Sequence, residues 1–187
     1  GKAVALSPDD KTDELMEGRK MRLIALETAK QVILNVAKKN AQLSGREYGL
    51  FEEYRTADAD YVMRLIGAAA GTAKQAVDEL REEGKKVGVL KLRVFRPFPA
   101  EEIAEALKNC KAAAILDRCE SYNGNGGPLG AEVMAGLYRK KIYISATNYI
   151  YGLGGRDFTT DDAKAVFAQL EESIATGREI EQYQYIG

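Results

Sequence analysis

The sequence predicts an α/β domain in three layers, with a mostly parallel sheet that helices cover on both faces. Short apolar runs alternate with segments of helical periodicity from about residue 60 onward, and glycine or proline stands between most of them. Strand–helix–strand units place their strands parallel, and several such units in succession form a sheet between two layers of helices. A long helix is predicted to precede this domain.

The first part of the chain is predicted to lie outside the sheet. Residues 1 to about 12 are polar and typical of a linker. From Thr12 to about Leu43, apolar residues recur at helical spacing, which predicts one long helix that stops near Gly45. The charged and aromatic stretch that follows is predicted to be a solvated connector. These features place a linker and a connecting helix in residues 1–55 and the α/β domain in residues 56–187.

Four strands and four helices are expected in the second part. The strands are the apolar runs YVMRLIG, VGVLKLRVF, AAAILD and KIYIS. Three helices are expected over residues 72–83, 99–108 and 128–138. The fourth carries its apolar stripe on Ala163, Val166, Phe167, Leu170 and Ile174. The tail GREIEQYQYIG shows no regular period.

The composition excludes several classes of site. The 187 residues include 27 basic and 28 acidic side chains and no histidine. A net charge of −1 provides no attraction to nucleic acid or to an acidic membrane surface, and no apolar run could span a bilayer. Without histidine the chain has no Ser-His or Cys-His nucleophile and no histidine metal site. We expect a cytoplasmic protein, and the lack of an initiator Met suggests a piece of a longer one.

Cys110 and Cys119 are the two cysteines of the chain. Their spacing is far from C-x-x-C, and two thiolates cannot hold an iron–sulfur cluster by themselves. Free thiols are favoured over a disulfide in a reducing compartment. Any redox carrier of this protein is therefore expected on other chains or cofactors.

The segment GNGGPLG, residues 124–130, lies between a predicted strand and a predicted helix. One interpretation is a phosphate site at the helix N-terminus. The spacing argues against it, because RCESYN separates the glycines from the strand and no acidic residue ends a following strand to hold a ribose. A mobile loop is the preferred interpretation.

The segment NYIYGLGGRDFTTDD raises the same choice between an anion site and a structural loop. Thr159 is placed to cap the following helix, with Asp161 and Asp162 in its first turn, where carboxylates are stabilised and a phosphate is repelled. Structure and interface are therefore favoured over ligand binding. The interface or loop candidates of the chain are Arg96, Asn148, Gly152, Gly154, Gly155, Arg156 and Asp157.

Strand-end polar residues have two interpretations each. Arg96 and Arg118 could grip a carboxylate or phosphate, or they could pair locally. Asp117 would be a catalytic candidate only with an acid or base partner, and the sequence shows none. No catalytic, cofactor-binding or metal-binding residue is assigned. The tyrosines clustered in YISATNYIYG and in EQYQYIG are compatible with a protein interface.

Several phrases together resemble a known family. RPFP, LDR, GPL and GLGGRD occur in that order within KVGVLKLRVFRPFPAEEIAEALKNCKAAAILDR and NYIYGLGGRDFTTDD. The chain resembles, over most of residues 20–170, the alpha subunit of 2-oxoacid (pyruvate):ferredoxin oxidoreductases. The part that matches resembles their C-terminal domain, which is similar to the last domain of transketolase.

The resemblance implies a fold and a function. The fold would be a five-stranded, mostly parallel sheet with one antiparallel strand. The whole complex would use thiamine diphosphate, Mg²⁺ and iron–sulfur clusters to decarboxylate a 2-oxoacid oxidatively, with electrons passing to ferredoxin and the acyl group to CoA. Its partners would be beta, gamma and delta type subunits, and this piece would serve packing and subunit contact rather than chemistry.

One loop departs from the family pattern. The chain has SYNGNGGPL where family members often have SFGAEGPL, so residues 119–127 align least well and are compatible with a less usual substrate, another 2-oxoacid or oxalate. Two alternatives stay open at this point. One is a small nucleotide- or CoA-binding module, and the other is the equivalent domain of a transketolase or a 2-oxoacid dehydrogenase.

Overall fold

A computed structural model describes residues 12–122 and 124–187 of the chain. It divides the chain into two units, Gly1–Gly49 and Leu50–Gly187, a few residues before the boundary predicted from the sequence. Residues 1–11 of the predicted linker lie outside the described residues.

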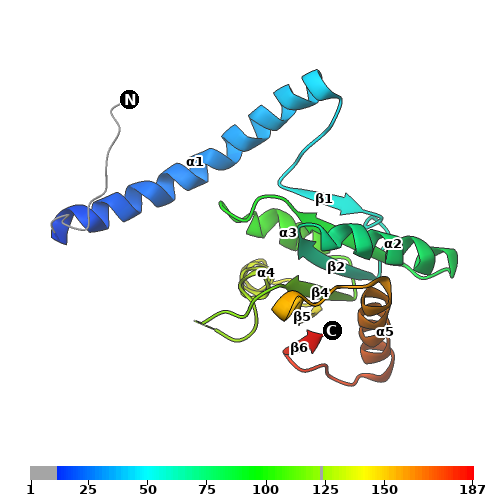
Figure 1. The fold of residues 1–187 in the computed structure, drawn as a ribbon. Coiled ribbons are helices and arrows are strands. Elements are labelled where there is room, and N and C mark those ends of the chain that lie inside the picture. The colour runs from blue at the N-terminus through cyan, green and yellow to red at the C-terminus, as the bar shows by residue number, and fades with distance from the viewer. Residues whose placement is uncertain (1–11, 123) are drawn as a thin grey trace. The chain divides into compact units, whose positions relative to one another are not determined.

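The described part of the first unit is dominated by a single long helix, α1, over Thr12–Ser44 (Figure 1). It ends as the sequence predicts, at Gly45, whose φ of 68° is favourable for glycine and whose N–H donates to the carbonyl of Ala41. Large apolar residues are exposed along much of its length: Leu15, Met16, Met21, Leu23, Ile24, Val32, Val36 and Leu43.

The second unit is built on one six-stranded sheet in the order β1-β3-β2-β4-β5-β6. The strands are β1 (Phe51–Tyr54), β2 (Tyr61–Ile66), β3 (Val87–Leu92), β4 (Ala112–Asp117), β5 (Ser145–Tyr151) and β6 (Tyr183–Ile186). Only β1 is antiparallel to its neighbour, and all other neighbouring pairs are parallel. The four inner strands, β3, β2, β4 and β5, are buried over most of their length, as parallel strands between helical layers must be.

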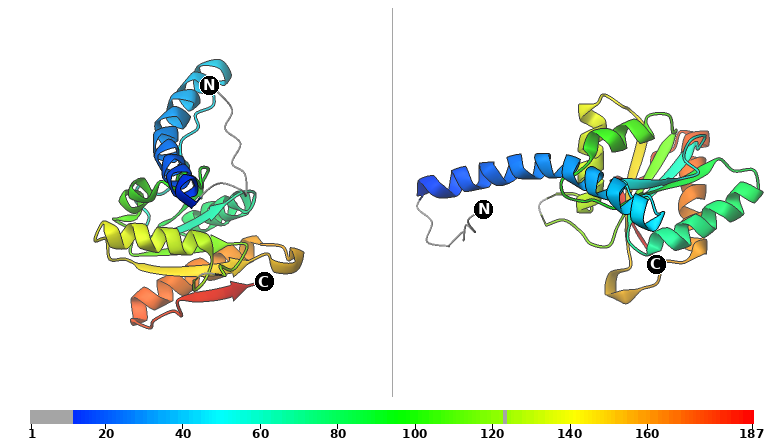
Figure 2. Two further views of the ribbon diagram at one scale, coloured as in Figure 1. Left: turned by 90° about the vertical axis from the view of Figure 1, so that its left-hand side faces the viewer. Right: turned by 90° about the horizontal axis from the view of Figure 1, so that it is seen from above.

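Helices cover both faces of this sheet (Figures 1 and 2). They are α2 (Ala69–Glu82), α3 (Ala100–Leu107), α4 (Pro128–Arg139) and α5 (Thr160–Thr176), with a short 3₁₀ helix η1 at Leu153–Gly155. One hydrophobic cluster joins α2 and α5 to the sheet, and a second joins α3 and α4 to its other face. The predicted fold class is confirmed, with one strand more than the five that the resemblance implied.

The additional strand and one shifted strand have physical explanations. The tail carries β6, which adds to β5 in parallel from Tyr183 onward although its sequence has no apolar period. The strand predicted over KIYIS is wrong, because Lys141 has a φ of 57° and the N–H of Ile142 donates to Leu137 to close the end of α4. Pairing with β4 begins only at Ser145.

The connector predicted before residue 60 is also partly wrong, since Phe51–Tyr54 forms β1. One of the charged residues of β1, Glu52, has two cationic partners. The Glu52 carboxylate pairs with Arg93 at 2.6 Å and with Lys74 from α2. These hydrogen bonds hold the pKa of Glu52 below its ordinary value. An edge strand with such partners does not need an apolar pattern.

Candidate functional site

The three loops that the sequence singled out follow parallel strands and lie at one edge of the sheet. RPFP follows β3, the Cys119–Gly127 loop follows β4, and the glycine-rich segment follows β5. Asn123, within the second loop, lies outside the described residues. In parallel sheets this carboxyl edge is where functional loops gather.

Asp117 is the centre of a buried hydrogen-bond network at this edge. Its exposed fraction is 6%, and its carboxylate accepts from the N–H groups of Leu129 and Gly130 at 3.0 and 2.9 Å. The side-chain amide of Asn148 donates to the same carboxylate at 2.9 Å and to the Ile115 carbonyl at 2.8 Å. Asn148 also accepts from the N–H of Gly127 at 2.7 Å. The sequence showed no partner for Asp117, because most of its partners are backbone groups.

The network explains why the segment before α4 is rich in glycine. A Cβ atom on Gly130 would lie 2.6 Å from Cγ of Asn148, and one on Gly127 would overlap the Asp117 carboxyl group. Glycine is required at both positions because the backbone approaches these side chains closely. Burial raises the pKa of Asp117, and the hydrogen bonds from Leu129, Gly130 and Asn148 oppose that rise.

This arrangement bears on the phosphate interpretation of GNGGPLG. The N-terminal N–H groups of α4 are the groups that a phosphate would use, and the carboxylate of Asp117 already accepts from two of them. A bound phosphate would have to displace a buried carboxylate of the same sign. The segment therefore serves the interior of the domain, and it does not favour a nucleotide-binding module.

The segment after β5 differs from its prediction at one residue. Asn148 was grouped with the interface or loop candidates, but it lies within β5 with an exposed fraction of 2%. Its amide is used inside the domain, where it is hydrogen-bonded to Ile115 and Asp117 of β4 and to Gly127. The remaining candidates of that segment do lie in the loop.

The loop itself is shaped by glycine and ended by a capping box. Gly152 has a φ of 68°, and Gly154 and Gly155 also have positive φ. Thr159 accepts from the N–H of Asp162 at 3.1 Å, and the Asp162 carboxylate accepts from the N–H of Thr159 at 2.8 Å. The N-cap predicted at Thr159 is confirmed.

The two arginine candidates have local partners. Arg96 pairs with Glu132 at 2.6 Å and lies with its guanidinium 4.3 Å from the centroid of the Phe95 ring. Arg156 donates to the carbonyl of Gly187. Asp157 is exposed in the same loop. These residues are not brought together into one site, and their role as contacts for other surfaces stays a prediction.

A buried arginine was missed from the sequence. Arg64 lies on β2 with an exposed fraction of 0%, and its three side-chain nitrogens have no hydrogen-bond partner among the described residues. Its guanidinium lies 5.4 Å from the ring centroid of Phe98. Burial lowers its pKa to about 9, and the charge of Asp117 opposes this. A lone arginine inside the apolar run YVMRLIG was the signal that could have identified it.

A cavity of about 370 Å³ opens at this edge between β2 and β4. Its lining comes from the turn between β2 and α2, from the ends of β4 and β5, and from two further residues, Phe95 and Pro128. The residues after β4 in this lining are Arg118 and Cys119.

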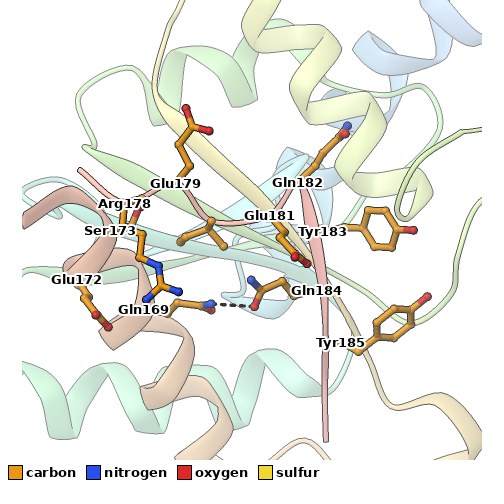
Figure 3. A pocket seen from close by; sticks show the side chains of 11 residues that line it. Gln169, Glu172, Ser173, Arg178, Glu179, Glu181, Gln182, Tyr183, Gln184 and Tyr185 are labelled. Atoms are coloured by element: carbon orange, nitrogen blue, oxygen red, sulfur yellow. Dashed lines mark hydrogen bonds between the residues drawn. The ribbon is translucent and has the colours of Figure 1, made fainter. Parts of the chain in front are cut away.

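A larger, polar groove of about 790 Å³ lies between the end of α5 and β6 (Figure 3). Gln169 donates to Gln184 at 2.8 Å across it, and the hydroxyl of the buried Tyr149 donates to Gln169 at 2.8 Å. Tyr183 and Tyr185 extend from the other side of β6, their rings 6.2 Å apart. The two hydrogen bonds of Gln169 join uncharged side chains.

Both cysteines are free, as predicted. Cys110 is buried and its thiol donates to the carbonyl of Leu107, and burial raises its pKa to about 12. Cys119 is exposed. Across the described residues, no group of three histidine, cysteine or acidic side chains could hold a metal ion. None of the helices in that part of the chain is long and apolar enough to cross a bilayer.

Comparisons with known proteins agree with the resemblance. A family model described as pyruvate:ferredoxin oxidoreductase core domain II matches residues 59–163. The pyruvate synthase subunit PorA of Methanocaldococcus jannaschii is 43% identical over 86% of this chain and 41% of its own length. The ketoisovalerate oxidoreductase subunit VorA of Pyrococcus horikoshii is 43% identical over 85% of this chain and 41% of its own length.

A solved structure also aligns with the chain. It is the 2-oxoglutarate:ferredoxin oxidoreductase of Magnetococcus marinus with 2-oxoglutarate, coenzyme A and succinyl-CoA bound, at 19% identity and a TM-score of 0.46. The alignment covers 73% of this chain and 21% of the other. The chain thus spans about two fifths of the length of the curated relatives named above.

Proposed function

Because the chain belongs to the family of pyruvate:ferredoxin oxidoreductase core domain II, we propose that it is the C-terminal portion of the alpha subunit of a 2-oxoacid:ferredoxin oxidoreductase. The complete enzyme would use thiamine diphosphate to decarboxylate a 2-oxoacid oxidatively in the cytoplasm. Electrons would pass to ferredoxin through iron–sulfur clusters, and the acyl group to CoA. The similarity to subunits of pyruvate synthase and ketoisovalerate oxidoreductase supports this proposal.

Within that enzyme, we propose that this portion serves packing and subunit contact. The observation that supports this role most directly is the engagement of Asp117, a buried carboxylate at the carboxyl edge, in structural hydrogen bonds. A carboxylate that caps a helix and accepts from Asn148 has no free geometry for proton transfer. The apolar side chains exposed along α1 are suited to contacts with other parts of the enzyme.

The cofactors of the proposed enzyme do not fit the residues described in this chain. Iron–sulfur clusters are held by four cysteine thiolates in most proteins, whereas Cys110 is buried and directed to a backbone carbonyl. Mg²⁺ is bound by oxygen ligands, chiefly carboxylates and phosphate oxygens, and residues 12–122 and 124–187 contain no group of three histidine, cysteine or acidic side chains that could hold a metal ion. We therefore propose that these cofactors are held by the rest of the complex.

We propose pyruvate as the substrate of the complete enzyme. The relatives act on different 2-oxoacids, as their names state, and the departure in residues 119–127 leaves another 2-oxoacid or oxalate as alternatives. The residues described here do not contact a substrate in this proposal. The choice is therefore decided by other parts of the enzyme.

The test is an activity assay of the complete complex. The full-length subunit is co-expressed with its partner subunits, and reduction of ferredoxin is measured with pyruvate, 2-ketoisovalerate or oxalate in the presence of CoA. We expect pyruvate to support the fastest reduction and the 187-residue chain alone to support none. Ferredoxin reduction by the chain alone would contradict the proposed role, and a complex without iron–sulfur clusters would contradict the proposed enzyme class.

A further inference from the structure

The function proposed for this chain does not involve the cavity between β2 and β4. Its volume of about 370 Å³ falls within the range of small-molecule sites, roughly 300–1,000 Å³. The chain turns toward β3 after β2 and toward β5 after β4, so the cavity lies where the connections diverge to opposite sides of the sheet. Ligands of open α/β sheets bind in the crevice at this divergence.

The walls of the cavity are mainly apolar. Ile66, Phe95, Leu116 and Tyr151 contribute side chains from four different segments, and Pro128 closes one side. The Tyr151 ring is nearly buried, with an exposed fraction of 3%, and packs against Phe158 at a centroid distance of 5.1 Å. A rigid lining of this kind fits the apolar body of a small molecule.

A cation without an acidic partner lies at the mouth. Arg118 lines the cavity and is exposed, and its guanidinium lies 5.8 Å from the centroid of the Tyr151 ring. Within the part of the chain that the structure describes, no carboxylate pairs with it. A Cβ atom on Gly152 would lie 3.0 Å from its Nε, so the loop after β5 leaves room for this side chain. A guanidinium in this position can form two hydrogen bonds with a carboxylate or phosphate.

The charges around the cavity favour an anion. Arg64 lies on the same face of β2 as Ile66 and two residues below it, buried and without a hydrogen-bond partner among the described residues. The acid in the lining is Asp117, whose oxygens already accept three hydrogen bonds from α4 and β5. The turn that leads into α2 also lines the cavity, and the first turn of this helix contains no acidic residue. Its N-terminal dipole therefore adds to the positive potential.

We propose that this cavity binds a small organic anion, with its carboxylate or phosphate paired to Arg118 and its apolar body between Ile66, Phe95 and Tyr151. The proposal requires both parts of the ligand. A bare phosphate leaves the apolar walls in contact with water, and a neutral aromatic molecule leaves Arg118 unused. Both are expected to bind more weakly than a molecule that combines the two.

In the test, the 187-residue chain is titrated separately with phenyl phosphate and with benzoate, and binding is followed by heteronuclear NMR. We expect saturable chemical-shift changes at residues that line the cavity. The probe that binds with the higher affinity identifies the preferred head group, carboxylate or phosphate. Inorganic phosphate and benzyl alcohol are expected to bind at least about tenfold more weakly, since each lacks one half of the interaction. If either control compound binds as tightly as the probes, or if the chemical-shift changes are confined to other surfaces, the proposal is wrong.

Three variants connect the binding to the cavity. Arg118→Gln is expected to lower the affinity for the more tightly bound probe at least about tenfold, which corresponds to ~1.4 kcal/mol of binding free energy. Arg139→Gln removes the same charge from an exposed position at the other end of α4 and should leave the affinity unchanged. Ala68→Leu keeps the charge and fills the mouth, and should abolish binding. Unchanged affinity of Arg118→Gln or of Ala68→Leu, with unfolding temperatures equal to that of the parent chain, would refute the proposed site.

Discussion

Two glycine-containing segments lie at the carboxyl edge of the sheet, and they need glycine for different reasons. In the segment before α4, Gly127 and Gly130 are required because Asp117 and Asn148 occupy the space of a side chain. In the segment after β5, Gly154 has a positive φ and no atom within 4 Å of a Cβ placed on it. The first segment is part of the interior, and the second is an exposed loop whose course depends on backbone conformation. Similar glycine content therefore does not indicate similar function.

The strongest test of this comparison is Gly127→Ala. The added Cβ would overlap the Asp117 carboxyl group, so the network must open or the start of α4 must move. We expect the free energy of unfolding to fall by about 3 kcal/mol, the upper part of the range for overpacked sites. The measurement is urea unfolding followed by circular dichroism.

Gly124→Ala is the matched control for this variant. It lies in the same loop, has a Cβ position with no neighbour within 4 Å, and is expected to change stability by less than about 0.5 kcal/mol. Equal effects at Gly124 and Gly127 would show that the loop, and not the network, governs stability.

The second test replaces Asn148 by alanine and by aspartate. Asn148→Ala removes a donor to Asp117 and an acceptor for Gly127, and should cost about 2 kcal/mol at neutral pH. Asn148→Asp keeps the shape but places a second carboxylate beside Asp117, whose pKa is already raised by burial. We expect a larger loss than for alanine at pH 7.

The effect of Asn148→Asp should depend on pH. Two adjacent carboxylates raise the folded-state pKa of the pair above its unfolded value, so the folded state binds a proton more readily. Stability relative to Asn148→Ala should therefore recover as the pH falls through that raised pKa. A difference between the two variants that stays constant from pH 7 to pH 5 would contradict this account.

A smaller effect is expected at the end of the exposed loop. Thr159→Ala removes the hydroxyl that accepts from the N–H of Asp162 and should reduce stability by about 1 kcal/mol. Thr159→Ser retains that hydroxyl and should restore most of the loss. If serine and alanine are equivalent in thermal unfolding, the capping box does not stabilise α5.

Gly154→Ala tests the exposed loop itself. Because the site has space for a Cβ, the expected cost comes only from the positive φ and is about 1 kcal/mol. The surface exposed on unfolding should be unchanged, so the slope of the free energy of unfolding against denaturant concentration should equal that of the parent chain. A loss as large as that of Gly127→Ala would remove the distinction between the two segments.

The smallest effect on stability is expected for Arg156→Ala. Its contact with the Gly187 carbonyl is exposed, and its loss should change the free energy of unfolding by less than about 0.5 kcal/mol. If this loop contacts other parts of the enzyme, the variant should instead weaken assembly of the full complex in sedimentation velocity. Unchanged assembly would contradict the predicted contact role of Arg156.

Elements with strong local signals were predicted from the sequence. The helix end at Gly45, the cap at Thr159 and the strand AAAILD each depend on residues within a few positions of one another. Strands β1 and β6 were missed because their four-residue stretches lack an apolar pattern and are defined by the neighbouring strand. The start of β5 was misplaced for the same reason, since its register is set by β4.

The alternation of strands and helices, the absence of histidine chemistry and the resemblance to a family depend on residue type and order, so they can be read from the chain alone. The roles of the polar residues at the sheet edge depend on which segments the fold brings together. Asp117 and Asn148 are 31 positions apart and meet because β4 and β5 are neighbours. Their contact fixes the glycines before α4 and leaves Arg118 free to face a cavity, and no local pattern of residues encodes that arrangement.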